Sequence, residues 1–253
     1  MTATPGARGA DRRRGLADQT VVVIGGSAGI GLETARQVRA DGGQVVLAGR
    51  DPEKLERAAR ELEPVGAAAF DATDTGRLEQ FFQDLPGPVD HVMVTGGGPT
   101  YVPLAEMDLA AACDEFGRRL AMTLGVALCS RDKVRPGGTL LFMGGTGARR
   151  PGVGLAVASA LTAASPALIA NLALEMAPVR VNLIAAGFVD TPLSASLLGD
   201  RLEARREELR ATLPIRRVVG PADVAALAVH LMCNDALTGA TYDIDGGQQL
   251  ISP

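Results

Sequence analysis

A glycine-rich segment between an apolar run and an amphipathic run constrains the fold of this chain more than any other feature. The run TVVVI at 20–24 has the length and β-branched content of a buried strand, GGSAGIG follows at 25–31, and 30–41 carries apolar residues at helical spacing. Glycines let the backbone turn tightly and approach a phosphate group, and the start of the following helix offers amide donors and a positive dipole. The segment therefore predicts a strand, turn and helix that bind a dinucleotide pyrophosphate.

Short apolar segments and longer amphipathic segments alternate along the rest of the chain. The short segments predict strands at 44–48, 67–70, 89–95, 139–143, 179–185 and 241–244. The amphipathic segments predict helices at 52–62, 75–83, 109–131, 155–176, 193–213 and 221–232, the first of them capped by Asp51. This strict alternation is typical of the α/β class, here a Rossmann-type, doubly wound parallel sheet of about seven strands.

No internal boundary or repeat interrupts the alternation, so we expect a single domain over residues 18–253. The hydrophobic content of 47% suits one sizeable core. Residues 1–17 are polar and rich in Gly, Arg and Asp, which predicts a disordered N-terminal extension. No apolar region follows Arg12–Arg14, so we do not expect a secretory signal.

Composition argues against several kinds of partner. A net charge of −4 provides no basic surface for nucleic acid. No run approaches the roughly 18 apolar residues of a membrane span without Gly, Pro or charge, so we expect no membrane contact and a soluble protein. Cys113, Cys129 and Cys233 are far apart, which predicts neither a disulfide framework nor a metal site and fits a cytoplasmic location.

The residues after the second predicted strand indicate which dinucleotide binds. NAD-binding proteins place a carboxylate there to hold the ribose 2′-hydroxyl, whereas this chain reads LAGRDPEKL at 47–55, with Gly49 at that place and Arg50 next. An arginine guanidinium can bind a 2′-phosphate through two hydrogen bonds. We therefore expect NADP(H) as cofactor; the alternative is that Arg50 is an ordinary surface residue beside the helix cap at Asp51.

With these motifs the chain resembles the short-chain dehydrogenase/reductase family from residue 18 to residue 249. GGSAGIG is similar to the family's TGxxxGIG, TGGGP at 95–99 lies where the family has NNAG, RVNLIAAGFVDTP at 180–192 is similar to RVNxIxPGxxxTP, and YDIDGG at 242–247 contains the family's DGG. The resemblance implies a homodimer or homotetramer that pairs through the helices at 109–131 and 155–176. It also implies a cofactor site made of Gly25, Ser27, Gly29, Ile30, Gly31, Arg50, Asp71, Gly96, Gly187, Val189 and Thr191, with Asp71 approaching the adenine.

The family's catalytic residues do not carry over to this chain. They are an Asn, a Ser, and a Tyr and Lys spaced YxxxK, and the resemblance implies that the Tyr gives or takes a proton while the Lys lowers its pKa. Aligned through LALEMAPVRVN at 172–182, the four positions hold Met122, Gly145, Ala158 and Thr162. Neither Tyr101 nor Tyr242 has a lysine four residues later, so no other register restores the motif. We do not expect ordinary tyrosine-dependent carbonyl reduction.

Three side chains are candidates to replace the missing functions. Tyr101 follows the fourth strand and could act as an acid, Thr146 adjoins the missing Ser, and Arg149, with its neighbour Arg150, could bind an anion or stabilise an oxyanion. Each has a structural alternative: a surface aromatic, a satisfied turn hydroxyl and solvated loop charges. His91, within a predicted strand, is expected to be structural.

Glycines at 96–98, 144, 145 and 147, together with Ala158, remove side chains around the predicted nicotinamide position. They predict a wide cavity suited to a small-molecule substrate that is largely apolar.

Three functions remain open on these residues. The first is an NADP(H)-dependent oxidoreductase with an unusual proton supply, acting on a conjugated or otherwise activated substrate. The second is a non-redox enzyme on the same scaffold, such as a cyclase, isomerase or dehydratase, which works by binding and orientation. The third is a non-catalytic homologue that senses NADP(H) or pairs with an active partner.

Overall fold

The computed structural model describes residues 15–251, in which seven parallel strands form one sheet in the order β3-β2-β1-β4-β5-β6-β7. The strands are β1 (Thr20–Ile24), β2 (Gln44–Gly49), β3 (Gly66–Ala69), β4 (Val89–Val94), β5 (Val134–Gly145), β6 (Arg180–Ala186) and β7 (Thr241–Ile244). The chain winds outward from β1 to β3, then crosses to β4 and winds outward to β7. The predicted Rossmann-type sheet is confirmed, and its strand order reverses between β1 and β4, where such sheets bind ligands.

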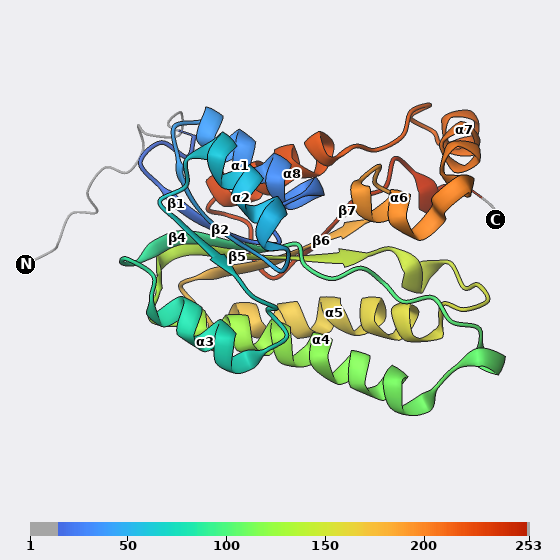
Figure 1. Cartoon of the computed structure of the whole chain (residues 1–253), viewed down its shortest axis with the longest axis horizontal. Coiled ribbons are helices and arrows are strands. Elements are labelled where there is room, and N and C mark those ends of the chain that lie inside the picture. Colours follow the sequence, from blue (N-terminus) through green and yellow to red (C-terminus); the bar gives the residue numbers. More distant parts are fainter. Residues whose placement is uncertain (1–14, 252–253) are drawn as a thin grey trace, which may run out of the picture.

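Helices cover both faces of the sheet. The helices α1 (Gly29–Ala40), α2 (Pro52–Leu62) and α8 (Pro221–Cys233) lie on one face, above the sheet in Figure 1. The helices α3 (Thr75–Gln83), α4 (Leu109–Ser130) and α5 (Ala156–Glu175) lie on the other. Each face has its own core, because successive strand residues point to opposite sides. In β1, Val21 and Val23 belong to the core under α1 and α8, whereas Val22 and Ile24 belong to the core above α3 and α4.

The segment after β6 differs from the single helix predicted at 193–213. It forms α6 (Pro192–Leu198), a short 3-10 turn (Gly199–Arg201) and α7 (Leu202–Thr212). The break falls at Gly199, whose φ of 53° lies in the left-handed region that a helix cannot continue through. Both helices stand beyond the end of β6 (Figure 1), at the edge of the sheet where the motifs converge.

The predicted N-terminal extension is wrong in its last three residues. Gly15, Leu16 and Ala17 belong to a turn, and Leu16 is fully buried in the core beside Val21. Burial of a leucine stabilises the fold by about 2 kcal/mol, which explains why the ordered chain begins before β1. The rest of the predicted extension, residues 1–14, lies outside the described residues.

Among the described helices, α5 alone is long and apolar enough to cross a membrane by length and mean hydropathy, and 17% of that stretch is buried. Pro166 lies within it, and the helix packs against β6 and α4.

Two buried polar side chains support the centre of the sheet. The His91 imidazole in β4 lies 2.6 Å from the Gln19 amide oxygen through Nε2, and its burial lowers its pKa to about 3, with a contribution from the charge of Arg180. Arg180, in β6, donates to the carbonyls of Leu231 and Met232, at 2.8 and 2.7 Å, at the end of α8. Both side chains have structural environments, as expected for His91.

Candidate functional site

The glycine-rich loop forms a cradle of backbone amides at the carboxyl edge of the sheet. Gly25 has a φ of 92°, and a side chain at Gly31 would collide with the Gly25 carbonyl and lie 2.7 Å from Thr95 Oγ1. Because α1 starts without a side-chain cap, its first amides keep their hydrogen-bonding capacity. This combination of close backbone approach and a helix N-terminus suits a pyrophosphate.

The end of β2 excludes a carboxylate and presents an arginine. A Cβ atom built on Gly49 would lie 2.8 Å from Ser27 Oγ, so a longer side chain there would displace the serine. Arg50 is exposed and has no carboxylate within ion-pair distance among residues 15–251. Asp51 is engaged elsewhere: its carboxylate accepts from the Lys54 amide at 3.1 Å, which caps α2 and lowers the pKa of the carboxyl. Arg50 is therefore not held by the neighbouring aspartate.

Asp71 lies directly beyond β3, next to the end of β2. Its carboxylate accepts from the amide and the hydroxyl of Thr73, at 2.9 and 2.8 Å. The bond from the Thr73 amide holds the pKa of Asp71 below its ordinary value, and the charge of Arg50 acts in the same direction. The carboxylate is thus fixed and ionised beside the arginine that follows β2.

The segments after β4 and β6 carry the rest of the expected cofactor residues. Thr95 donates from Oγ1 to the carbonyls of Ile24 and Gly25, which ties the end of β4 to the glycine loop. Gly96 has open space where a side chain would be. Across the cleft, a Cβ atom on Gly29 would lie 3.6 Å from the Thr191 side chain.

The predicted cofactor residues therefore share one edge of the sheet. They are Gly25, Ser27, Gly29, Ile30 and Gly31 after β1, Arg50 after β2, Asp71 after β3, Gly96 after β4, and Gly187, Val189 and Thr191 after β6.

Of the positions aligned with the family's tetrad, Gly145 and Thr162 lie together, and none of the four carries an acid. A Cβ atom on Gly145, at the end of β5, would lie 3.4 Å from Thr162 Cγ2 in α5. The Thr162 hydroxyl donates to the carbonyls of Ala158 and Ser159, at 2.9 and 3.1 Å, so it is bonded within its own helix. Met122 is buried in the core against the sheet. None of these side chains can supply a proton near neutral pH.

The candidates for a replacement acid or charge have other contacts. Tyr101 is about half exposed, at 53%, and burial raises the pKa of its phenol, the opposite of the shift that a strong acid needs. Thr146 is buried, and its amide donates to Ala186 O at 3.1 Å. Arg149 pairs with Asp243 and donates to the Gln249 side chain, so its charge is already compensated. Arg150 donates to Gln248 O at 3.1 Å.

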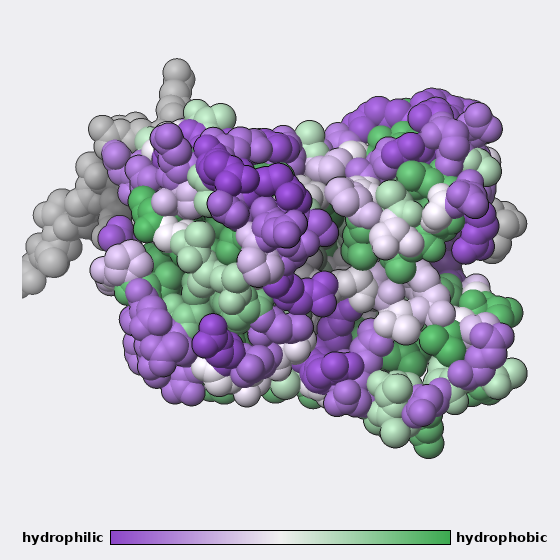
Figure 2. Space-filling model, viewed as in Figure 1, coloured by the Kyte–Doolittle hydropathy of each residue, from purple (hydrophilic) through white to green (hydrophobic). Residues whose placement is uncertain are grey.

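A cavity of about 400 Å³ lies beside these positions, between the loop after β4 and the start of α5. Ser159 is the one polar side chain in its lining, which otherwise consists of Val102, Leu104, Pro151, Gly152, Val153, Gly154, Leu155 and Ala156. Leu104 and Val153 are exposed, and Figure 2 shows apolar surface at the lower right, where Figure 1 places the loop after β4. The cavity suits an apolar group.

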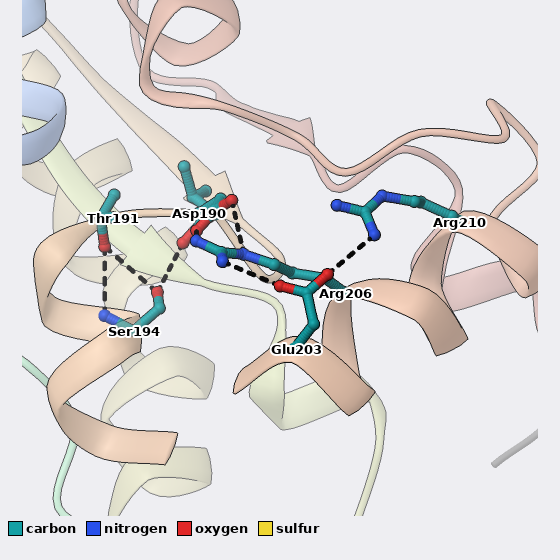
Figure 3. A network of polar contacts seen from close by, with 7 residues as sticks. Asp190, Thr191, Ser194, Glu203, Arg206 and Arg210 are labelled. Atoms are coloured by element: carbon teal, nitrogen blue, oxygen red, sulfur yellow. Dashed lines mark hydrogen bonds and ion pairs between the residues drawn. The ribbon is translucent and has the colours of Figure 1, made fainter. Parts of the chain in front are cut away.

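Sequence reasoning missed two groups of contacts at the site. Arg119, on α4, donates to the carbonyls of Gly97 and Gly98, and the missing side chain of Gly97 makes room for the guanidinium. Arg206, on α7, binds Asp190, the residue before Thr191 (Figure 3). The only signal in the sequence was the spacing of Glu203, Arg206 and Arg210, which alone indicates a solvated helix face.

Comparison with protein families agrees with this geometry. The family model described as Enoyl-(Acyl carrier protein) reductase matches residues 25–249. Dehydrogenase/reductase SDR family member 4 from Sus scrofa is 30% identical over 256 residues, covering 94% of this chain and 90% of that protein. The short-chain dehydrogenase/reductase malC from Malbranchea aurantiaca is 27% identical, covering 97% and 99%.

Solved structures show the same architecture. The structure of the MalC reductase/Diels-Alderase from Malbranchea aurantiaca matches with a TM-score of 0.87 at 26% identity and covers 95% of this chain and 100% of that one. A small-chain dehydrogenase in complex with NADPH matches with a TM-score of 0.79 at 25% identity, covering 92% and 100%.

Proposed function

The chain belongs to the short-chain dehydrogenase/reductase family, and from that premise we propose that it binds NADP(H) and acts as an oxidoreductase without a tyrosine acid. Gly25–Gly31 would hold the pyrophosphate, Arg50 the 2′-phosphate, Asp71 the adenine end, and Val189 and Thr191 the nicotinamide end. The bound cofactor supplies hydride transfer. The chain's own residues bind and orient the two reactants.

The contact between Gly49 and Ser27 carries this proposal. A carboxylate after β2 would have to displace Ser27 Oγ, which lies 2.8 Å from the place of its Cβ atom. Arg50 beside it has no ion-pair partner in the described part of the chain, and a phosphate dianion would provide one. The NADPH complex of a structural relative supports this choice of cofactor.

The absence of an acid at Ala158 limits the substrate. Reduction of a plain ketone needs a proton donor at the developing alkoxide, and the Thr162 hydroxyl, one turn from Ala158, is already committed to its own helix. We therefore propose a substrate with a conjugated or activated double bond. The apolar cavity lined by Val102, Leu104 and Leu155 would receive its hydrocarbon part.

A non-redox reaction is the second candidate. The relative named as a reductase/Diels-Alderase aligns over nearly the whole chain, which favours chemistry by substrate binding and orientation on this scaffold. Product formation with no change in NADPH concentration would identify it. A protein that binds NADPH and turns over no substrate would instead fit a non-catalytic sensor or partner.

We also propose that the chain pairs with a second copy through α4 and α5. Both helices expose leucines, namely Leu120, Leu124, Leu128 and Leu174. The proposal places the protein in the cytoplasm, where its three cysteines remain reduced.

Titration calorimetry tests the cofactor assignment. The wild-type protein should bind NADPH at least about tenfold more tightly than NADH, because the 2′-phosphate gains a charge-assisted contact. Arg50→Met should remove that preference. Arg60→Met, on the exposed face of α2 where Arg60 pairs with Glu56, should retain it. Equal binding of both cofactors to the wild type, or no binding of either, would refute the proposal.

A further inference from the structure

The first turn of α6 lies between the glycine loop and the segment after β4, and we call the expected cofactor site between these segments the cleft. Thr191 packs against Gly29 of the glycine loop, and a Cβ atom on Gly98 after β4 would lie 2.9 Å from Leu193 Cδ1. We call Thr191–Ser194 the roof of the cleft. Because α6 has no buried residue, apolar packing does not fix the roof.

Polar contacts fix the roof at its start. The Thr191 hydroxyl accepts from the Ser194 amide at 3.2 Å and lies 3.1 Å from the Ser194 hydroxyl, which donates to Val189 O. The Asp190 amide donates to Val219 O at 2.9 Å. These bonds join Val189, Asp190 and Thr191 into one rigid stretch immediately before the helix.

Arg206 ties this stretch to α7. Its guanidinium forms a fork on the Asp190 carboxylate, with Nε at 2.9 Å and Nη2 at 2.7 Å. The remaining nitrogen donates to Glu203 at 3.1 Å, and Glu203 also pairs with Arg210 at 3.1 Å (Figure 3). The helix that carries Arg206 is itself fixed, because Leu209 is buried and Leu213, which follows α7, is buried too.

The ion pair between Arg206 and Asp190 contributes more to the orientation of Asp190 than to folding stability. Isolated ion pairs near the surface add little to folding stability. A bidentate guanidinium held by a second carboxylate, however, restricts the orientation of its partner. Here the partner is the residue between two predicted cofactor contacts, Val189 and Thr191.

We propose that Arg206 is a positioning residue that holds the roof, through Asp190, at the nicotinamide end of the cofactor cleft. This inference rests on the proposed binding of NADP(H). It assigns Arg206 no contact with the cofactor and no role at the adenosine end, where Arg50 and Asp71 lie.

Binding of two different ligands reports separately on the two ends of the cleft. NADPH occupies both ends, whereas adenosine 2′,5′-bisphosphate carries the phosphates of the adenosine end and no nicotinamide. Arg206→Met should weaken NADPH binding about tenfold in calorimetry, the loss expected for one misplaced charge-assisted contact. Binding of the bisphosphate should stay within about twofold. Arg206→Lys keeps the charge and loses the two-bond contact with Asp190. Its NADPH affinity should lie between those of the wild type and Arg206→Met.

Arg205→Met is a matched control. Arg205 precedes Arg206 on α7 and has nearly the same side-chain exposure, 29% against 28%, but its partner Glu208 lies on the same helix, at 2.7 Å. It should leave both affinities unchanged. Equal weakening of both ligands by Arg206→Met, or NADPH binding within about twofold of the wild type, would overturn the inference.

Hydrogen–deuterium exchange tests the roof without any cofactor. Peptides covering 189–198 should exchange faster in Arg206→Met than in the wild type or Arg205→Met. Unchanged exchange would overturn the inference. A wild-type protein that binds neither ligand would refute the proposed function, and the exchange result would still decide whether Arg206 holds the roof.

Discussion

The loops after β1 and after β5 are both rich in glycine, yet their glycines meet different surroundings. Side chains on Gly25 and Gly31 would collide with neighbouring backbone or with Thr95 Oγ1. Side chains on Gly145 and Gly147 would find no atom nearer than 3.4 and 3.9 Å. Gly25 and Gly31 are therefore needed for the packing of the first loop, whereas Gly145 and Gly147 leave room for at least a Cβ atom.

The same difference distinguishes the expected cofactor residues from the positions aligned with the family's catalytic residues. The expected cofactor side consists mainly of backbone groups and turns, which the fold itself maintains. The strand β5 and the helix α5 form with Gly145, Ala158 and Thr162 at the positions aligned with the family's catalytic residues. We therefore expect NADP(H) binding without the family's tyrosine-dependent chemistry.

The strongest test of this difference is to restore the family's catalytic side chains on β5 and α5. The triple variant Gly145→Ser, Ala158→Tyr, Thr162→Lys should reduce simple ketones with NADPH at a rate about a hundredfold or more above the wild type, because it restores a proton donor and its lysine. NADPH oxidation measured by absorbance reports the rate.

The matched control for that experiment carries Phe in place of Tyr at position 158 and the same Ser and Lys. It should be as inactive as the wild type. Equal rates in the two triple variants would show that these positions do not form a catalytic group.

A side chain added in the loop after β1 should weaken cofactor binding. Gly31→Ala should weaken NADPH binding about a hundredfold, because the methyl group forces the Gly25 carbonyl out of the cradle. Calorimetry measures the affinity. The control Gly117→Ala introduces the same methyl group within α4, where nothing lies within 4 Å, and should leave the affinity unchanged.

Low pH should decrease the free energy of unfolding through His91, which lies in β4. Its pKa is about 3 in the folded protein and 6.5 in the unfolded chain, so the unfolded state takes up the proton first. The stabilisation is complete above pH 6.5 and falls by roughly 1.4 kcal/mol per unit as the pH decreases toward 3. Urea unfolding at pH 7 and 4.5 should therefore show a smaller loss in His91→Asn than in the wild type. The same loss in both would assign the effect to other groups.

The smallest effect is expected at Tyr101. Its phenol is half exposed and its pKa is raised by burial, so Tyr101→Phe should leave turnover within about twofold of the wild type. A loss of about tenfold or more would make it the replacement acid.

The fold could be predicted because its signals are local, and the expected cofactor residues were placed on it by the same signals. The run TVVVI, the glycine loop and the pair Gly49 and Arg50 follow one another along the chain, and hydrophobic periodicity places each on its element. The contacts of Arg206 and Arg149 could not be predicted in this way. Asp190 lies 16 residues from Arg206, and Asp243 lies 94 residues from Arg149, so only the folded chain brings each pair together.

The break within 193–213 was missed for a related reason. A single glycine in a charged, periodic segment costs a helix about 1 kcal/mol, too little to predict an interruption. The N-cap at Thr191 fixes the start of α6, and Arg206 ties α7 back to Asp190, so the chain turns between the two helices, at Gly199.

The lack of any buried residue in α6 also has an evolutionary consequence. Substitutions at Leu193 and Leu197, which are 47% and 42% exposed, remove little core packing, so selection can change them with small penalties to folding. The anchors at Thr191 and Asp190 stay in place while these side chains vary. Sequence change can therefore accumulate along this short helix without a prior gain of stability elsewhere.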